Sequence, residues 1–599
     1  MNNLTTIIPR IWSYIRPYRV RFFSSIFFGI ANVGGLALYP FLLGLIINEL
    51  SANVMDMVNN VPDAGVNFAF VTQYSIYPII VFIIEVIGQY LSLYLMAGAI
   101  QNAMHDLRRD ISEKTNRIPV SFFDTNQTGD ILSRTTNDVD TISNALQQSV
   151  INGFIAVLTI VFSFGMMLYI DWRMTILVVM AMFLSVLATK FITTRSQPIF
   201  DKQQNILGDL FGFTQEQLSC FTEIKAYNKQ NQSLEVFKEK NNELYKYGTR
   251  SNFLSSILQP ISTIIFNLTY VAVVGFGGMG VMMGSFTIGA IQSFLSYISS
   301  VTQPINQLTQ LVGLIQSAIS AGSRIIDYLD EEEEFQRDTD QQLPSKVKGH
   351  VVFDHVKFGY SNDNLLMDDV SFEVLPGQTA AIVGPTGAGK TTLINLLMRF
   401  YDVLDGEIRI DGVNIKNISR HGLRQHLGMV LQDAWLFSDT IMENIRFGDL
   451  DAVEYQVREA AEIANVDKFI DTLPGAYQME INDEGTNVSQ GQKQLMTIAR
   501  AVISDPDILI LDEATSSVDT RLEHLIQEAM DKVMSNRTSF VIGHRLSTIR
   551  DADIILVMQN GTIIESGSHD VLMAKNGFYA DLYNSQFNQE APADIHMSF

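Results

Sequence analysis

The feature of this sequence that most constrains its fold is a long segment without charge. Between residues 251 and 323 there is no Asp, Glu, Lys or Arg. A water-soluble domain carries charged side chains at much shorter intervals, whereas a segment within a lipid bilayer must largely exclude them. The sequence therefore predicts that part of the chain crosses a membrane.

Six apolar segments are long enough to cross a bilayer, which takes about 20 helical residues. They lie near residues 22–48, 69–104, 144–170, 172–194, 251–282 and 286–323. Basic residues gather in the links 105–140 and 190–250, whereas the link 49–68 has acidic residues only. Because basic links stay in the cytoplasm, we expect residues 1–323 to form a multi-pass domain of the cell membrane, with both termini cytoplasmic.

The two long links have a helical pattern, so we expect the flanking membrane helices to continue well past the bilayer. Their tips lie at residues 122–129 and 220–227, and the first carries two aromatic residues, Phe122 and Phe123, that are expected to be exposed. These tips are either ordinary hairpin ends or docking points for the cytoplasmic half of the chain. The single cysteine, Cys220, excludes an intrachain disulfide and is expected to be a packing residue.

Two features of the membrane segments have alternative interpretations. Glu85 stands alone in the second segment, where a carboxylate either lines a substrate cavity or lies near an interface or a polar neighbour. The glycine-rich run 275–280 either permits close helix packing or loosens the end of the fifth segment. Four phenylalanines of the last two segments either line an apolar cavity or face lipid: Phe266, Phe276, Phe286 and Phe294.

The composition changes abruptly after the last apolar segment. An acidic run at 327–334 is expected to be solvated, within a linker over 324–349. Apolar strands and helical segments then alternate over 350–587 as in a parallel α/β core, and 588–599 form a tail. The net charge of −23 argues against a nucleic-acid partner, which would need clustered Lys and Arg.

A glycine-rich loop with one lysine is the strongest motif of the second domain. It lies between a strand-like run and a helix-like run and fits the pattern G-x-x-x-x-G-K-T of a phosphate-binding loop. Lys390 is expected to reach the outer phosphates, and Thr391 to give its hydroxyl to Mg²⁺. The sequence therefore predicts binding of a nucleoside triphosphate by this P-loop. Its residues are Gly384, Pro385, Thr386, Gly387, Ala388, Gly389, Lys390, Thr391 and Thr392.

Three more motifs are expected to complete the site. The apolar run 508–511 ends in Asp512, which suits Mg²⁺ binding, and Glu513, which is placed to polarise a water against the γ-phosphate. A second apolar run delivers His544 to the same sheet edge, where it is expected to hold the γ-phosphate and the attacking water. The third motif begins a helix and supplies a Ser as its N-cap. The N-terminus of this helix is a second anion site, which suggests that the site is completed by another subunit. The residues of this motif are Val488, Ser489, Gln490, Gly491 and Gln492.

In this order the motifs resemble those of an ATP-binding cassette (ABC) exporter half-transporter, over essentially the full chain. The resemblance implies a six-helix α-helical transmembrane domain followed by an α/β P-loop ATPase domain. It also implies that two such chains pair in a membrane. Each P-loop would then bind ATP and Mg²⁺ and close against the 488–492 motif of the partner chain, which is called the signature. Residues 483–485 and 122–134 resemble an exporter-specific segment and the first coupling loop.

The resemblance implies roles for individual residues. Tyr360 would stack on adenine, and Asp519 would lie in a loop at the dimer interface. Catalysis would involve Glu513, His544 and Gln432, and Mg²⁺ would be held by Thr391, Gln432 and Asp512.

The signature departs from the family's Leu-Ser-Gly-Gly-Gln pattern. Val488 and Gln490 occupy its first and third places, and a Gln side chain is expected to crowd the opposing γ-phosphate, which Gly would let approach. Glu513 of the same chain is intact. This combination favours one half of an asymmetric heterodimer, with a homodimer as the alternative.

The most favoured function is ATP-driven, multidrug-type export of small hydrophobic or amphipathic compounds by alternating access. A lipid or lipopeptide flippase is the alternative within the same class. An ATP-gated channel or a regulatory subunit is the alternative from a different class.

Overall fold

The computed structural model describes residues 4–61, 65–334, 343–344, 346–361, 364–432, 434–482, 487–512, 520–543 and 549–587. It consists of two compact units. The first comprises Met1–Asn116 and Gln127–Glu331, and the second comprises Arg117–Asn126 and Glu332–Phe599. The short segment Arg117–Asn126 therefore interrupts the first unit in sequence and belongs to the second.

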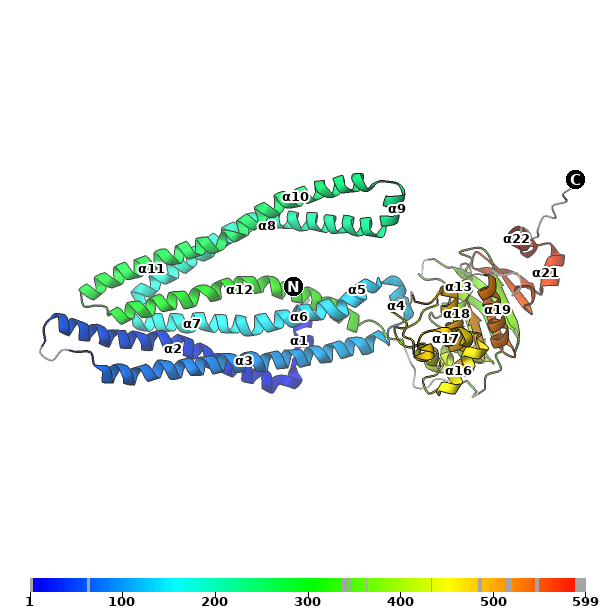
Figure 1. Ribbon diagram of the computed structural model, residues 1–599, viewed down its shortest axis with the longest axis horizontal. Coiled ribbons are helices and arrows are strands. Elements are labelled where there is room, and N and C mark those ends of the chain that lie inside the picture. The colour runs from blue at the N-terminus through cyan, green and yellow to red at the C-terminus, as the bar shows by residue number, and fades with distance from the viewer. Residues whose placement is uncertain are drawn as a thin grey trace. The chain divides into compact units, whose positions relative to one another are not determined.

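In the described residues of the first unit, helices joined by short turns and loops are the regular secondary structure (Figure 1). Its elements are α1 (Leu4–Ile15), η1 (Arg16–Tyr18), α2 (Arg19–Val58), α3 (Phe68–Thr115), α5 (Thr128–Ser133), η2 (Arg134–Asp138), α6 (Val139–Leu146), η3 (Gln147–Asn152), α7 (Gly153–Ile170), α8 (Trp172–Ser219), α9 (Phe221–Ala226), α10 (Gln230–Ser256), α11 (Leu258–Met282) and α12 (Ile288–Leu329). The two stretches η2 and η3 are π-helical turns.

The six expected membrane segments all lie in helices of this unit. Five helical stretches are long and apolar enough to cross a membrane, by length and composition: Thr5–Val58, Phe68–Thr115, Thr128–Ile170, Trp172–Ser219 and Gln230–Met282. The sixth segment is α12, which is rich in Ser, Thr and Gln. Its side chains Phe294, Tyr297 and Ile298 are fully buried among other helices, so α12 depends less on contact with lipid.

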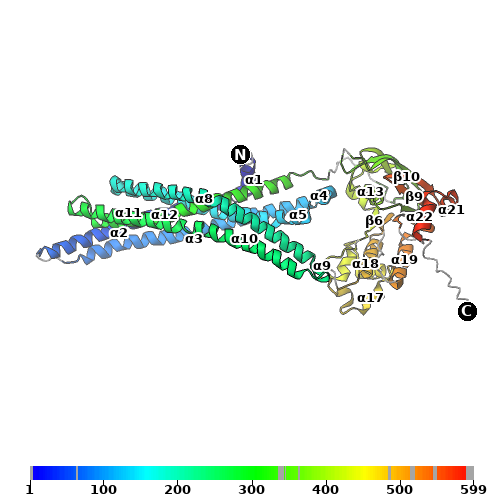
Figure 2. The same ribbon diagram turned by 90° about the horizontal axis from the view of Figure 1, so that it is seen from above.

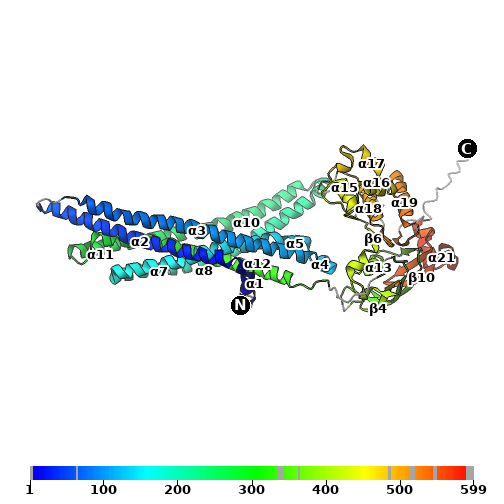
Figure 3. The same ribbon diagram turned by 90° about the horizontal axis from the view of Figure 1, so that it is seen from below.

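Several helices extend beyond the length that a bilayer requires, as the sequence predicted. Helices α3 and α8 have 48 residues each, roughly 70 Å at a rise of about 1.5 Å per residue, against a hydrocarbon core of about 30 Å. Helices α8 and α10 run side by side, and α9 lies at their tip (Figures 1 and 2). Helices α2 and α3 form a second long pair (Figure 3).

The expected role of Cys220 is wrong. This residue lies in the turn between α8 and α9, where its backbone leaves the helical conformation, and its side chain is exposed. At the tip of the α8–α10 hairpin, fewer elements surround a side chain than in the middle of a helix pair, which agrees with the exposure of the thiol.

The glycine-rich run 275–280 serves close packing at two of its glycines. A Cβ added to Gly277 would lie 2.8 Å from the Ile291 side chain, and one on Gly280 would lie 2.8 Å from the ring of Phe286. Gly275 and Gly278 have no neighbour within 4 Å of such a Cβ. The close-packing interpretation therefore holds for Gly277 and Gly280, which face the start of α12 and the residues before it.

The second unit contains two β-sheets. An antiparallel sheet has the order β2-β1-β4-β5, and a larger sheet has the order β10-β9-β3-β8-β7-β6. The strands are β1 (Val351–Phe358), β2 (Met367–Val374), β3 (Thr379–Val383), β4 (Asp405–Ile410), β5 (Val413–Asn414), β6 (Leu427–Val430), β7 (Ile508–Leu511), β8 (Thr538–Ile542), β9 (Ile554–Gln559) and β10 (Thr562–Gly567). Strands β6, β7, β8, β3 and β9 are parallel, as the alternation of strands and helices predicted.

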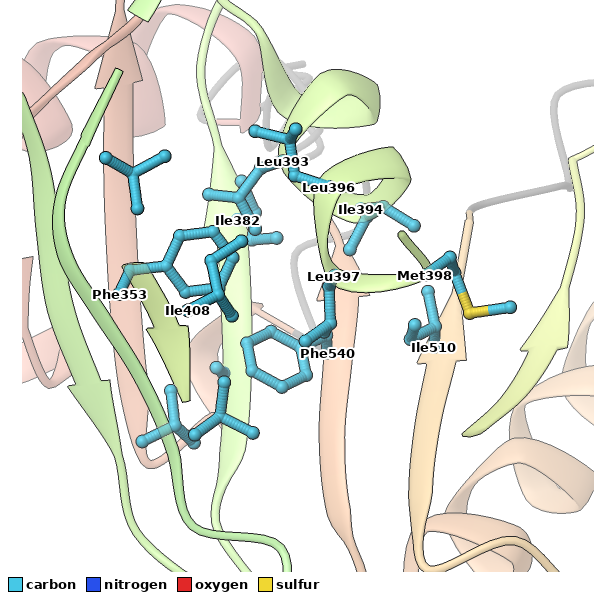
Figure 4. Close-up of a cluster of buried hydrophobic side chains, with 14 of the residues drawn as sticks. Phe353, Ile382, Leu393, Ile394, Leu396, Leu397, Met398, Ile408, Ile510 and Phe540 are labelled. Atoms are coloured by element: carbon cyan, nitrogen blue, oxygen red, sulfur yellow. The ribbon is translucent and has the colours of Figure 1, made fainter. Parts of the chain in front are cut away.

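Helices surround these sheets. They are α4 (Val120–Thr125), α13 (Lys390–Leu397), η4 (Ile415–Asn417), α14 (Arg420–Arg424), α15 (Ile441–Arg446), α16 (Glu454–Ile463), α17 (Asp467–Thr472), η5 (Ala476–Gln478), α18 (Gln490–Ile503), α19 (Thr520–Met534), α21 (His569–Lys575) and α22 (Phe578–Phe587). The apolar face of α13 packs Leu393, Leu396 and Leu397 into the cluster that contains Ile382 of β3 and Phe540 of β8 (Figure 4). This core fixes the start of α13 relative to the end of β3.

The acidic run is not solvated throughout, contrary to the sequence-based expectation. The Glu334 side chain is only 15% exposed and its carboxylate pairs with Arg424, at 3.1 and 3.2 Å. Its backbone amide donates to the carbonyl oxygen of Arg117 at 2.8 Å. A carboxylate with a charged partner can be buried at modest cost, and composition alone does not reveal that partner.

Candidate ATP-binding site

The predicted P-loop lies between β3 and α13. Pro385, Thr386 and Gly387 are exposed at its tip, whereas Ala388 is buried. Gly389 precedes α13 with a left-handed backbone (φ 102°), which favours glycine. A Cβ on Gly384 would lie 2.2 Å from the carbonyl oxygen of Met558. The glycines therefore permit a loop that a chain with larger residues could not form.

The lysine of the loop is held inside it. Lys390 is 8% exposed, and its Nζ donates to the carbonyl oxygens of Gly384 at 2.7 Å and Pro385 at 3.1 Å. This places the ammonium group within the ring of backbone that precedes α13, where the N-terminus of that helix adds partial positive charge. The arrangement suits phosphate oxygens.

Three further strand ends meet the P-loop at one edge of the large sheet. Strand β8 lies between β3 and β7, and β6 lies beside β7, all parallel. Asp512 follows β7, Gly543 follows β8, and Leu431 and Gln432 follow β6. The amide of Gly543 donates to the carbonyl oxygen of Ile382 in β3 at 2.9 Å. The fold therefore brings Lys390, Asp512 and Gln432 to the same edge, as expected for ligand sites of parallel sheets.

Several predicted site residues lie outside the described residues. These are Glu513, His544, Asp519 and residues 483–485. The described neighbours Asp512 and Gly543 immediately precede Glu513 and His544 in the sequence and lie at the expected sheet edge.

Tyr360, the residue predicted to stack on adenine, has an exposed side chain. The Tyr360 side chain is 56% exposed, and its hydroxyl lies 3.0 Å from Oγ1 of Thr392, which is buried in α13. An aromatic ring fixed at one edge and exposed on its surface can stack on a planar base. The ring is thus tied to the same helix that begins at Lys390.

The signature motif forms the start of α18 with Ser489 as N-cap, as predicted. The Ser489 hydroxyl accepts from the amide of Gln492 at 3.4 Å, and Oε1 of Gln492 accepts from the amide of Ser489 at 2.8 Å. This reciprocal pair is a capping box. Val488 and Gly491 are buried, whereas Gln490 is exposed at the first turn of the helix. Of the two residues that depart from the family pattern, Gln490 is therefore the one whose side chain is accessible at the surface.

The donor set fits Mg²⁺ bound together with a nucleotide. Thr391 carries a hydroxyl at the start of α13, and Asp512 carries a carboxylate at the neighbouring strand end. In the described part of the chain, no group of three or more His, Cys, Asp or Glu side chains is arranged to hold a metal by itself. Mg²⁺ is commonly held by one or two protein oxygens together with phosphate oxygens, which agrees with this sparse set.

Sequence reasoning missed Arg500, which anchors the signature helix. Its Nε donates to the carbonyl oxygen of Asn444 at 2.9 Å, and its guanidinium lies over the rings of Phe437 and Phe447. Burial lowers the pKa of Arg500. The sequence held little signal for this role, because Arg500 shares its face of the helix with Lys493 and Thr497.

In the first unit, Glu85 lies on α3 against α2. A Cβ on Gly35 of α2 would lie 3.0 Å from the Cβ of Glu85, and the Glu85 carbonyl oxygen accepts from Asn32 Nδ2 at 3.0 Å. The polar-neighbour interpretation has this backbone contact in its favour. A role for its carboxylate in a substrate cavity stays a prediction.

Comparison with known proteins agrees with this combination of units. Residues 22–305 match the ABC transporter transmembrane region and residues 367–516 match the ABC transporter family. The chain is 43% identical to a fatty acid ABC transporter ATP-binding/permease protein of Mycobacterium bovis, over 88% of this chain and 83% of that protein. It is 33% identical to the ATP-dependent lipid A-core flippase of Saccharophagus degradans, over 97% and 98% respectively.

A solved structure extends the likeness to the fold. The structure of a bacterial Atm1-family ABC exporter with ATP bound matches 96% of this chain and 99% of that chain, with a TM-score of 0.76 and 27% sequence identity. Together, a helical membrane unit and a P-loop unit on one chain define an ATP-hydrolysing membrane transporter. The chain belongs to the ABC transporter family, as a half-transporter homologous to bacterial ABC exporters. Such exporters function as dimers within membrane lipid.

Proposed function

We propose that this half-transporter exports small amphipathic compounds, using ATP hydrolysis to change the side of the membrane to which its cavity opens. The observation that carries the substrate class is a cavity of about 540 Å³ in the first unit. Its wall combines apolar side chains with a single guanidinium, a combination that suits a compound with an apolar body and an acidic head. The residues that line it include Arg173, Met174, Leu177, Phe276, Met279 and Phe286.

The four phenylalanines of the last two segments divide between cavity and core. Phe276 and Phe286 contribute to the cavity, whereas Phe266 and Phe294 are 4% and 0% exposed within a hydrophobic cluster. Met174, Met279 and Met283 give the cavity flexible, polarisable walls, which adapt to ligands of different shape. This favours a range of related substrates.

A lipid or lipopeptide flippase is the second candidate. Two relatives are named for amphipathic cargo, a fatty acid in one case and lipid A-core in the other. The open cavity beside α8 and α11 would admit a lipid from the bilayer as readily as a free compound. Reconstituted vesicles that contain either a fluorescent fatty acid or a fluorescent phospholipid would distinguish export from flipping.

For the ATP site we propose the assignments that the motifs imply. Lys390 and the P-loop amides hold the phosphates, Thr391, Gln432 and Asp512 hold Mg²⁺, and Glu513 with His544 directs the attacking water. The buried position of Lys390 and the shared sheet edge of Asp512 and Gln432 support this proposal.

We also propose that the chain works as one half of a heterodimer. The support is the exposed Gln490 at the first turn of α18, together with Val488 in place of the usual Leu. The chain's own P-loop would then pair with a normal signature on the partner and turn over ATP, and the site on Val488–Gln492 would bind ATP without efficient turnover. A homodimer that tolerates Gln490 is the alternative. Full, transport-coupled ATPase activity of this chain purified alone would exclude the heterodimer.

Both termini and the ATP-binding domain are proposed to lie in the cytoplasm, because Lys and Arg are concentrated in the links 105–140 and 190–250. Labelling Cys220, the exposed thiol at the tip of α8, from either side of sealed vesicles tests this orientation. Reaction only with reagents on the cytoplasmic side is expected.

A further inference from the structure

Three aromatic rings in the second unit connect the predicted adenine contact with the short helix α4. The rings of Tyr360 and Tyr401 are perpendicular, with centroids 5.1 Å apart. Phe358 packs edge to face against both, at 5.1 Å from Tyr360 and 5.6 Å from Tyr401. Because Phe358 is buried and Tyr360 is exposed, the cluster runs from the core of the unit to its surface.

Tyr401 also holds α4 directly. Its hydroxyl donates a hydrogen bond to the Asp124 carboxylate in the last turn of that helix. Burial first, and this bond second, raise the pKa of Tyr401, so the hydroxyl remains a donor at neutral pH. The segment Arg117–Asn126 belongs to the same unit as Tyr401 and is joined by the chain to α3 and α5.

The backbone on both sides of Tyr401 is fixed. Arg399 has a left-handed backbone (φ 51°), and its Nη1 donates to the carbonyl oxygen of Ile415 at 2.9 Å. Asp402 accepts from Arg399 Nε at 2.8 Å and from Arg420 Nη2 at 2.7 Å. Tyr401 can therefore respond to a change at Tyr360 chiefly by turning its side chain, which moves the hydroxyl that holds Asp124.

We propose that Tyr401 is a positioning residue that couples stacking of a nucleobase on Tyr360 to the placement of α4 through Asp124. This inference rests on the proposed function, because it takes Tyr360 as the contact of the base. Its consequence is specific: the base, and not the phosphates, fixes α4. Occupation of the P-loop by a triphosphate without a base leaves α4 as it is in the nucleotide-free protein.

Hydrogen exchange in the full-length chain, in its purified membrane assembly, tests the proposal. The reporters are amides of α4 and its end, such as Phe122, bonded to Pro119, and Asn126, bonded to Phe122. An ATP analogue with an imido β–γ bridge is expected to slow their exchange by roughly three- to tenfold, in the range of the net contribution of one typical hydrogen bond. Magnesium tripolyphosphate, at a concentration that displaces the analogue, is expected to leave their exchange unchanged.

Two variants separate coupling from binding. Tyr401→Phe keeps the ring and removes the donor, and Asp124→Ala removes the acceptor. Each is expected to abolish the nucleotide-dependent slowing while the affinity for a fluorescent ATP analogue stays unchanged, and the double variant is expected to add nothing further. Tyr455→Phe, at an exposed tyrosine of α16, is the matched control and should behave as the wild type.

The outcomes are distinguishable. Slowing that persists in Tyr401→Phe, or equal slowing by tripolyphosphate, would overturn the role of Tyr401 while leaving ATP-driven transport in place. A fall in nucleotide affinity in Tyr401→Phe would make it part of the binding site and not a positioning residue. A wild-type protein that binds no nucleotide would remove the proposed function itself.

Discussion

The backbone amide of Asp512 donates a 2.9 Å hydrogen bond to the carbonyl oxygen of Val430. This bond continues the pairing of β7 with β6 by one residue beyond the ladder. It sets the Asp512 carboxylate next to the start of the segment that carries Gln432. The contact therefore fixes the backbone of Asp512 beside the end of β6, two residues before Gln432.

Replacement of Asp512 by Asn is therefore expected to impair turnover without unfolding the domain. The amide keeps the size of the carboxylate but loses the charge that favours Mg²⁺. We expect Mg²⁺-dependent ATP hydrolysis to fall by roughly a hundredfold or more, comparable to the loss when one group that stabilises charge in a transition state is removed. Steady-state ATPase assays over a Mg²⁺ titration measure this, with the exposed Asp551→Asn as control. Equal turnover in the Asp512 and Asp551 variants would contradict the assignment.

Replacement of Glu513 by Gln separates a pump from a channel. The variant is expected to bind ATP normally, because the P-loop is intact, and to lose steady turnover, because the group that polarises the attacking water is gone. For an exporter, transport into vesicles should cease after at most one cycle. Continued substrate flux with ATP bound and not hydrolysed would instead favour an ATP-gated channel.

Replacement of Gln490 by Gly tests the asymmetry of the signature. Gln490 is exposed at the first turn of α18, and removing its side chain allows closer approach of a facing phosphate. ATP turnover by the assembly is expected to rise, up to about twofold if a second site of equal rate becomes active. Gln527→Gly in α19 controls for the cost of a glycine in a helix, about 1 kcal/mol. An unchanged or lower turnover would mean that the Gln490 side chain does not limit ATP hydrolysis at the site that contains this signature.

From the surroundings of Asp402 we predict that the stability of the protein depends on pH. Burial raises the pKa of Asp402, but the hydrogen bond from Arg399 and the charges of Arg420, Arg399 and Lys416 outweigh it and hold the pKa below its ordinary value. The stabilisation is therefore fully present above the unfolded pKa of about 3.9 and is lost as the pH falls through the lower folded pKa. Asp402→Asn should lower the melting temperature at pH 7, by about 2–4 °C per kcal/mol lost.

Thermal unfolding of the wild type and of Asp402→Asn between pH 7 and pH 3 measures this effect. The difference in melting temperature should be constant above pH 5 and shrink as the solution becomes more acidic, because the wild-type carboxyl then also loses its charge. The exposed Asp451→Asn serves as control and should match the wild type throughout. A difference that is independent of pH would show that lost packing, and not charge, destabilises the variant.

The sequence predicted the parts of the protein that depend on local patterns. The charge-free segment and the apolar runs located the helical unit, and the strand-loop-helix context of Lys390 located the P-loop. Because parallel strands present their carboxyl ends at one edge, Asp512 and the strand that leads to His544 were expected to end at the same edge. The placement of Gln432 at that edge was implied only by the family resemblance. The Ser489 N-cap was also visible, since Ser before an amphipathic helix is a local signal.

Contacts between residues distant in the sequence could not be predicted in the same way. The pairing of Glu334 with Arg424, and of Tyr401 with Asp124, joins segments 90 and 277 residues apart. No pattern in the sequence marks the partner of Glu334 or of Tyr401. The acidic run was therefore predicted to be solvated, and no role was predicted for Tyr401. The exposure of Cys220 likewise depends on where a turn falls between two helices. Such features can be identified only when the tertiary arrangement is known.

The central claim is that binding and hydrolysis of ATP at the P-loop drive the movement of an amphipathic compound across the membrane. The most direct test is ATP-dependent uptake of a fluorescent fatty acid by sealed vesicles that contain the reconstituted assembly, compared between the wild type and Lys390→Ala. We expect uptake by the wild type that requires ATP and Mg²⁺, and none above the protein-free background with Lys390→Ala. Equal uptake by both proteins would contradict the account.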